Sequence, residues 1–456
     1  MKKLLSALIL VAFTAVPSHS EPLKSLVLKA LKENHMVNAS SWKVKEQEEE
    51  YKATIGLLFP KIWFEEDAIR SSSPPFVWMS KMSRKDVVPS MMNLKGFNDP
   101  DAVTDFKSSI NAAMPLFRGG EILSAIKARR YAFEIAKDIN KKTKEEIVLE
   151  VTKSYLEICW LKSRVKAARS AVKTAGRHVK QAKALYTKGM ALKADLLKAK
   201  VYLSAQKERL VREKTSLNIA RRKLSILVGK SPQELTDTES DIESLYARLK
   251  RLNLNLNSLI NNALNRRKDL TAVRKRINIE RQNLRIAYSD YFPKIDVVSS
   301  WEWHGHNFPG DSDGAAWSIG AVAKLNIFDG LIRERKVKKA KARIIQAEEL
   351  AREKEKEVVL EVISSVLRIK EARENIRTAK TAVAEARESL KVIEKRYSQG
   401  LATITELTDT QTALEEAKAR YLGALHQYLM SVYSAYYSAG SLLEFIGVGG
   451  EKGAEN

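Results

Sequence analysis

The sequence is poor in residues that break helices or cross-link a chain. Its 456 residues include 19 glycines, 11 prolines and one cysteine, Cys159. Glycine and proline together fall well below their usual combined share of about 12%, which argues against a turn-rich all-β protein and a long disordered chain. A single cysteine excludes a disulfide framework within the chain. These scarcities indicate a protein built from long helices.

Long apolar stretches are also scarce. After residue 16, no segment approaches the roughly 18 apolar residues of a membrane-spanning helix, which excludes a polytopic helical membrane protein. The N-terminus has a lysine pair, an apolar run over 4–16 and small residues within 17–20, the layout of a secretory signal peptide. We expect residues 1–20 to be removed by cleavage after Ser20, so that the mature chain leaves the cytoplasm. A short buried helix is the alternative.

Acidic residues are outnumbered by basic ones. The chain has 79 lysines and arginines against 55 aspartates and glutamates, a formal net charge of +24. Such a surplus attracts nucleic acid or anionic lipid. Export removes most contact with nucleic acid, and the basic residues alternate with Glu and Ala, as over 351–357. We therefore interpret the charge as solvated helix faces and expect no nucleic-acid partner.

Motifs recur along the chain at two fixed spacings. A shift of 211 residues (328 − 117) and one of 233 residues (293 − 60) each relate short motifs in the first half to motifs in the second. The first shift relates Phe117–Gly119 to Phe328–Gly330, Tyr186–Gly189 to Tyr397–Gly400, and Gly229 to Gly440; the second relates Phe59–Ile62 to Phe292–Ile295. Such recurrence indicates a duplication. The predicted organisation is a signal peptide (1–20), a first repeat (21–230), an insertion (231–256), a second repeat (257–440) and a C-terminal tail (441–456).

Two segments keep the 4-3 apolar spacing of coiled coils. A sustained period of 3.5 residues predicts supercoiled helices that pack along a seam, here rich in the small residues Ala and Ser. A helix over 120–188 would measure on the order of 100 Å, which suits a cylinder or a stalk. The seam residues are Ile147, Val151, Ser154, Ile158, Leu161, Val165, Ala168, Val172, Ala175, Val179, Ala182 and Tyr186, and Ala372, Ile376, Ala379, Val383, Ala386, Leu390, Ile393 and Tyr397.

Four segments of about ten residues alternate apolar and polar side chains instead. They cover 61–69, 105–116, 295–304 and 317–327, and we expect the segment between Arg70 and Val103 to form the longer outer loop. This alternation is typical of strands in outer-membrane β-barrels, and Trp301, Trp303 and Trp317 suit an interfacial aromatic girdle. A soluble half-buried sheet is the alternative. Four strands cannot close in lipid, where every backbone group must be paired, so several chains must contribute. Two chains would give eight strands and a filled interior; three would give twelve and a lumen, which fits a duct better.

The motifs together resemble those of a known family. Tyr-x-x-Gly at both helix tips, Phe-x-Gly after each second strand and Pro-Lys-Ile before each first strand resemble the TolC-like outer-membrane efflux proteins (outer membrane factors). The resemblance covers nearly the whole mature chain. It implies a homotrimer with a twelve-stranded outer-membrane barrel and a periplasmic α-helical tunnel, docked to a periplasmic membrane-fusion adaptor and an inner-membrane transporter of the RND or ABC type. It also implies export of drugs, metals or polypeptides, the last as in type I secretion.

The resemblance assigns roles to residues at the tips and junctions. Gly189 and Gly400 match the tip turns, where the adaptor would make contact. Pro60, Gly119, Pro293 and Gly330 match the strand–helix junctions, and the insertion matches the region that girdles the tunnel. The residues matched to a periplasmic gate are Asp195, Glu406, Asp409 and Tyr397. An arginine that some members carry two residues after the second tip glycine is Ala402 here, so their interlocking ion pair is not expected.

Physical reasoning gives the tip acids two possible roles. Three copies of Asp195, Glu406 or Asp409 around a narrow lumen would favour cations. Alternatively, an acid in the first turn of a helix stabilises the helix dipole.

Other constellations are weak. His304 and His306 lie on one predicted strand face, but a metal site needs three or four ligands, so we expect lumenal polar residues and no metal or other cofactor. No nucleophile or acid–base constellation has fitting spacing, which argues against an enzyme at the outer membrane. The remaining rival is a secreted basic coiled-coil structural or adhesive protein, in which the alternating segments are soluble hairpins.

Overall fold

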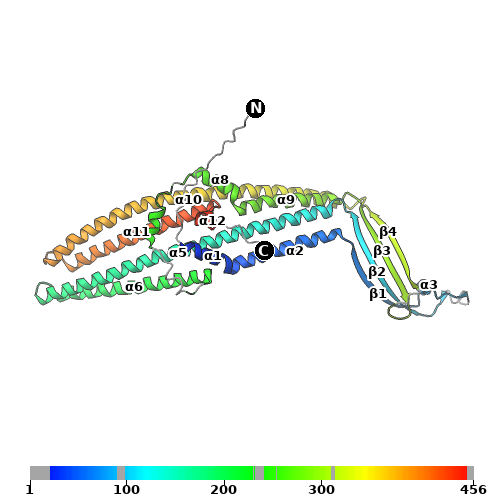
Figure 1. The fold of residues 1–456 in the computed structure, drawn as a ribbon, viewed down its shortest axis with the longest axis horizontal. Coiled ribbons are helices and arrows are strands. Elements are labelled where there is room, and N and C mark those ends of the chain that lie inside the picture. Colours follow the sequence, from blue (N-terminus) through cyan, green and yellow to red (C-terminus); the bar gives the residue numbers. More distant parts are fainter. Residues whose placement is uncertain are drawn as a thin grey trace, which may run out of the picture. The chain divides into compact units, whose positions relative to one another are not determined.

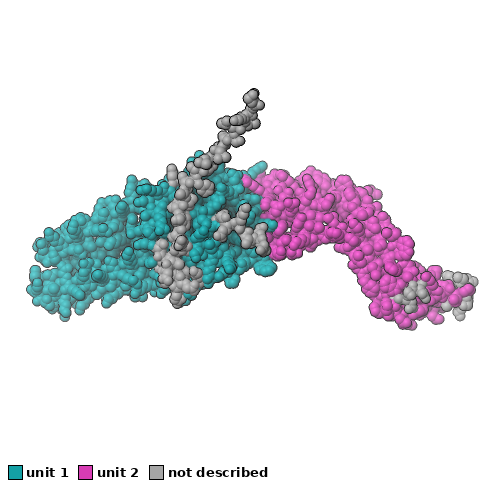
Figure 2. Space-filling model, in the orientation of Figure 1, with its two compact units in different colours: residues 1–43, 137–272, 351–456 teal, residues 44–136, 273–350 magenta. Residues whose placement is uncertain are grey.

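A computed structural model describes residues 21–89, 98–229, 231, 241–252, 254–309 and 314–448. The expected signal peptide lies outside these residues. The chain divides into two compact units (Figure 2). Unit 1 comprises 1–43, 137–272 and 351–456, and unit 2 comprises 44–136 and 273–350. Helices α2, α5, α9 and α10 contribute residues to both units.

The described residues are mostly helical (Figure 1). Each half of the chain supplies one helix of 67 residues, α5 and α10, and none of the described helices is long and apolar enough to cross a membrane. The helices are α1 (Glu21–Glu33), α2 (His35–Ile55), η1 (Gly56–Leu58), α3 (Pro74–Ser83), α5 (Glu121–Thr187), α6 (Lys193–Val228), α7 (Ile242–Leu249), α8 (Leu256–Arg266), α9 (Lys268–Ser289), α10 (Ile332–Ser398), α11 (Ile404–Ser438) and α12 (Leu442–Ile446).

The seams predicted from the 4-3 spacing are largely buried. Ala175 and Ala372 have no exposed surface, and Ile158 and Ile376 are nearly as buried. Alanine at these positions lets helices approach closely, so the long helices follow from the periodicity as predicted. Tyr186 differs, because its side chain is 41% exposed at the end of the first seam.

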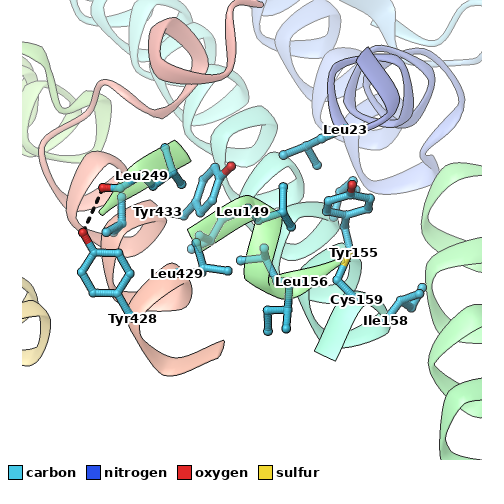
Figure 3. Packing of buried hydrophobic residues seen from close by; sticks show 14 of the residues in the cluster. Leu23, Leu149, Tyr155, Leu156, Ile158, Cys159, Leu249, Tyr428, Leu429 and Tyr433 are labelled. Atoms are coloured by element: carbon cyan, nitrogen blue, oxygen red, sulfur yellow. Dashed lines mark hydrogen bonds between the residues drawn. The ribbon is translucent and has the colours of Figure 1, made fainter. Parts of the chain in front are cut away.

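The main core of unit 1 lies where α5, α7 and α11 meet (Figure 3). Leu156 and Cys159 of α5 are buried there among leucines and tyrosines of the other helices. The hydroxyl of Tyr428 donates a hydrogen bond to the carbonyl of Leu249 (3.0 Å), which ties α11 to the last residue of α7. The insertion therefore contributes a helix to the core; residues 232–240 lie outside the described part of the chain.

Unit 2 contains a four-stranded antiparallel sheet in the order β1-β2-β3-β4 (Figure 1). The strands are β1 (Lys61–Ser71), β2 (Val103–Phe117), β3 (Lys294–Gly305) and β4 (Ala316–Lys324). All four occur where alternation predicts them. β2 and β3 pair although they come from different halves of the chain. β1 and β4 are the edges of the sheet.

Two details of this sheet differ from the prediction. The last strand was expected to reach residue 327 but ends at Lys324, which pairs with Lys294. Residues 325–327 extend past the start of β3, where Pro293 lacks a backbone N–H and no partner strand continues. The segment between β1 and β2, expected as a loop, contains helix α3, which begins with two prolines at positions suited to a helix start.

Both tips of the long helices end in the same turn. The amide of Gly189 donates to the carbonyl of Tyr186 (3.0 Å), and the next amide, of Met190, donates to Leu185 (2.9 Å). The second tip repeats this pattern around Gly400. Gly189 and Gly400 have φ values of 73° and 76°, a left-handed conformation that favours glycine and stops each helix.

Candidate functional site

One face of the sheet is apolar and exposed. The strand register brings Phe64, Ile110, Trp301 and Trp317 into one row across all four strands. Paired residues point to the same face, so the apolar positions predicted separately in each strand share one surface. Their exposed fractions range from 43% to 77%. A large exposed apolar surface of this kind marks contact with a membrane or another protein.

The opposite face of the sheet is polar. Lys107 of β2 pairs with Glu302 of β3 (3.1 Å). Near the helix-adjoining end of the sheet, Arg118 pairs with Asp296 (2.8 Å). A sheet with one apolar and one charged face matches the lipid and lumen faces of barrel strands.

Aromatic residues lie towards both ends of this sheet. Trp301 and Trp317 are paired directly, and Trp303 lies 6.4 Å from Phe64 between ring centres. At the other end, each of the four strand–helix junctions carries an exposed phenylalanine. These are Phe59, Phe117, Phe292 and Phe328.

The spacing of these aromatics fits a bilayer. The nine residue steps from Phe292, just before β3, to Trp301 correspond to about 30 Å of extended chain, or about 23 Å in height at the usual strand tilt, close to the apolar band of about 25 Å in barrels. The alternating segments predicted a girdle of tryptophans, whereas the phenylalanines were expected only as junction motifs. The recurrence of phenylalanine at all four strand–helix junctions was the sequence signal for this second group of aromatic residues.

The predicted junction residues lie where the strands meet the helices. Pro60 and Pro293 directly precede β1 and β3. Gly119 has φ +61°, and a Cβ there would lie 2.7 Å from the carbonyl oxygen of Ser289 and 2.9 Å from the Cβ of Phe292. Gly119 therefore permits close approach of α9. Gly330 has φ +69°, with open space around it in the single chain.

A charged cluster sits at the end of the sheet away from the long helices. Asp105 is 4% exposed and accepts a hydrogen bond from Nδ1 of His304 (2.7 Å) in the tautomer that carries the proton on that nitrogen. The buried Arg84 donates to the carbonyl of Thr104 (2.9 Å) and lies 3.7 Å from Asp105. His306 contacts Asp86 (2.9 Å). The two histidines thus contact separate carboxylates: His304 meets Asp105 within the sheet, whereas Arg84 and the contact between Asp86 and His306 connect the segment after α3 to the sheet.

The acids at the helix tips act as caps. Asp195 and Glu406 occupy equivalent positions in the first turns of α6 and α11. The carboxylate of Asp195 accepts a hydrogen bond from the amide of Leu192 (3.2 Å), and that of Glu406 accepts from the amide of Thr403 (2.6 Å). The hydrogen bonds from the Thr403 amide and hydroxyl lower the pKa of Glu406. Both residues thus make the local interactions expected at a helix N-terminus.

The other predicted gate residues differ in burial. Asp409 is exposed one turn beyond Glu406. Tyr397 is 3% exposed in an apolar cluster that joins the two tips, with Ala182 and Leu196 from the first and Leu407 from the second. Burial and the negative charge of Asp195 raise the pKa of Tyr397. The structure therefore brings Tyr397 and Asp195 into one neighbourhood.

Further along the helices from the tips, a polar cavity of about 300 Å³ lies between the α5–α6 hairpin and the α10–α11 hairpin. Glu415 of α11 is 8% exposed and accepts hydrogen bonds from Tyr202 (3.1 Å) and Arg209 (3.3 Å) of α6. Glu213 is similarly buried and pairs with Arg164 of α5 (2.5 Å). No sequence pattern identified these acids, because their partners lie up to 213 residues away.

Comparisons with known proteins agree with this architecture. A family model described as "Outer membrane efflux protein" matches residues 26–230 and 259–440. Outer membrane protein TolC of Salmonella enteritidis is 28% identical over 198 residues, 41% of this chain and 40% of that protein. The chain thus matches about two fifths of the length of that relative. TolC of Vibrio cholerae is 21% identical over 376 residues, 79% of this chain and 84% of that protein.

Solved structures show the same fold. The outer-membrane channel OprN has a TM-score of 0.77 at 18% identity, with 94% of each chain covered. The Vibrio cholerae outer membrane protein VceC has a TM-score of 0.74 at 17% identity, covering 92% of this chain and 96% of that one. The predicted architecture, long helices joined to a small antiparallel sheet, is therefore the fold that these structures share with this chain. Since the family model matches most of the chain, the chain belongs to the outer membrane efflux protein family and is an outer-membrane protein with a large periplasmic portion.

Proposed function

We propose that the protein forms a homotrimeric outer-membrane channel-tunnel through which an inner-membrane pump, coupled by a periplasmic adaptor, exports substrates from the cell. Three four-stranded sheets close into a twelve-stranded barrel, and the long helices form the periplasmic tunnel. Family membership makes the protein a channel rather than an enzyme and decides against a secreted adhesive protein.

The observation that carries this proposal is the sheet itself. Its apolar face is exposed across all four strands, yet β1 and β4 leave two unpaired edges within the chain. In lipid, each unpaired backbone group costs several kcal/mol. Pairing β1 of one copy with β4 of the next removes both edges, and three copies give a barrel wide enough for a lumen.

The proposed gate lies at the helix tips. Three copies of Asp195, Glu406 and Asp409 would place nine carboxylates around the tunnel end, which favours cations. The capping hydrogen bonds of Asp195 and Glu406 are compatible with this role, because they engage the carboxylate oxygens without adding a positive charge. The turns at Gly189 and Gly400 would meet the adaptor, and substrate choice among drugs, metals or polypeptides would rest with the pump.

Native mass measurement in mild detergent tests the assembly. The mature protein, extracted from outer membranes, should have the mass of three chains plus bound detergent. A monomer or dimer in a soluble fraction would contradict the barrel.

Reversal potentials in planar bilayers test the gate. The variant with Asp195→Asn, Glu406→Gln and Asp409→Asn should show a lower preference for cations. A control with Glu353→Gln, Glu374→Gln and Glu388→Gln removes three exposed acids of α10 that each pair with a basic residue three positions away. Equal reversal potentials for the tip variant and the control would place the tip acids outside the ion path.

A further inference from the structure

The helices of unit 2 follow the same order as the strands they adjoin. Glu50 of α2 pairs with Arg129 of α5 (2.8 Å), and Glu134 of α5 pairs with Lys275 of α9 (3.3 Å). Asp290, just past the C-terminus of α9, pairs with Lys336 of α10 (2.8 Å). The series α2-α5-α9-α10 therefore leaves α2 and α10 as its outer members, like β1 and β4 in the sheet.

The two outer helices carry opposite charge next to the sheet. The basic segment of α10, residues 332–343, has seven lysines and arginines and one glutamate. Five of these basic residues are exposed and form no ion pair with any described residue. They are Arg335, Lys338, Lys339, Lys341 and Arg343. The acidic segment of α2, residues 44–55, has four glutamates and two lysines.

Glu49 of α2 and Lys339 of α10 point away from the neighbouring helices of their own chain, whereas Glu50 pairs with Arg129 of α5. Tyr51 of α2 stacks on Phe133 of α5, and Glu49, two residues earlier, lies on the opposite side of the helix. Glu49 pairs with Lys52 in its own helix (3.0 Å), but both side chains are more than half exposed and such pairs are weak. On α10, Lys339 lies opposite Val337, which is 7% exposed.

A contact between the two halves of the chain shows how the two outer edges of unit 2 can meet in neighbouring copies. Phe117, at the end of β2, packs edge-to-face on Phe292, before β3, with ring centres 6.4 Å apart. The repeat shifts convert this pair into Phe328 and Phe59. These two residues lie at the opposite edges of the unit and are 78% and 63% exposed. Each edge therefore displays half of a contact that the chain already makes between its two halves.

We propose that the acidic segment of α2 pairs with the basic segment of α10 of a neighbouring copy of this chain, with Phe59 of one copy packed on Phe328 of the next. This inference rests on the proposed trimer, because pairing of β1 with β4 is what brings α2 beside α10. Two different surfaces meet in such a seam, so the contact is head-to-tail, and in the proposed trimer three such contacts close a ring. The charge pattern also opposes the wrong pairings, α10 with α10 and α2 with α2.

Charge reversal tests the seam on full-length protein in detergent. Lys338→Glu with Lys339→Glu places like charges across each of three seams, and should raise the concentration at which the trimer dissociates roughly tenfold or more at low salt. High salt should reduce this difference, because these pairs are exposed to solvent. Glu46→Lys with Glu49→Lys should act in the same direction. The variant with all four substitutions should recover wild-type assembly.

Lys127→Glu is the matched control. Lys127 is the repeat counterpart of Lys338 on α5, exposed but on a helix flanked by α2 and α9 of its own chain. It should leave assembly unchanged. If the wild type is a trimer and the reversals either have no effect or are not rescued by the combined variant, the α2–α10 pairing is wrong and the proposed channel stands. If the wild type is not a trimer, both proposals are wrong.

Discussion

Removing Arg267 should destabilise the helical unit strongly. Its guanidinium lies between α8 and α9 and is 3% exposed. It donates to both carboxylate oxygens of Asp269 (3.0 and 2.6 Å) and to Glu361 of α10, and lies 3.5 Å from the carbonyl oxygen of Ser438 of α11. One side chain, at the junction of α8 and α9, therefore contacts α9, α10 and α11.

The magnitude follows from what Arg267→Ala leaves behind. Breaking a buried ion pair costs about 3–5 kcal/mol. The side chain of Asp269 is 19% exposed and that of Glu361 is 46% exposed, and Lys354 lies 3.6 Å from Asp269. Water and Lys354 can partly compensate, so we expect a loss of about 2–4 kcal/mol in the free energy of unfolding.

The neighbouring Arg266 provides a matched control. It pairs with Glu444 (2.5 Å), but the two side chains are 46% and 64% exposed. Arg266→Ala should therefore cost about 0–1 kcal/mol. Urea unfolding of the detergent-solubilised protein, followed by helical circular dichroism, compares the two variants directly. Equal losses for Arg266→Ala and Arg267→Ala would refute the reasoning, because burial would then have no influence.

The same site predicts a pH dependence. Burial alone would raise the pKa of Asp269, but the hydrogen bonds and charge of Arg267 outweigh it and lower the pKa to about 2, from its usual 3.8. Since the folded-state pKa is the lower one, this contribution to stability is present above about pH 4 and is lost as the pH falls towards about 2. Solvent screening of this partly exposed carboxylate limits its contribution to the free energy of unfolding to about 1–2 kcal/mol. Arg267→Ala should remove this slope.

Three further substitutions test buried polar groups. Tyr397→Phe should keep stability within about 1 kcal/mol of wild type, because the buried hydroxyl has no hydrogen-bond partner among the described residues. Tyr428→Phe, which loses the bond to Leu249, should cost about 1 kcal/mol in the same urea assay, and a larger loss for Tyr397→Phe would reveal a partner in another copy. Burial lowers the pKa of His426, stacked on Trp160, to about 4. Its contribution to stability is therefore full above about pH 6.5 and falls by about 1–2 kcal/mol at about pH 5. His426→Phe should abolish that loss, and an unchanged pH profile would show that another group causes it.

The acids at the tips illustrate where sequence reasoning stops. Their spacing from the tip glycines is visible in the sequence, and so is their place in a first helical turn. The structure shows that Asp195 and Glu406 cap their helices. Their role in a tunnel depends on where the other two copies place theirs, and this stays a prediction.

The long helices, the four strands and the tip turns of this protein were predictable because each depends on neighbours in the sequence, whereas helix α3 was not. A period of 3.5 defines the long helices, alternation defines the strands, and glycine after Tyr-x-x stops the helix at each tip. Burial and pairing depend instead on residues far apart. Arg266 and Arg267 are adjacent and of the same residue type, yet only the side chain of Arg267 is buried. Likewise, Asp105 meets His304 across 199 residues, and Glu415 meets Tyr202 across 213. Local patterns therefore determined which elements form, whereas the tertiary structure decided which charges lose contact with water and with what they pair, because desolvation depends on the whole packed arrangement.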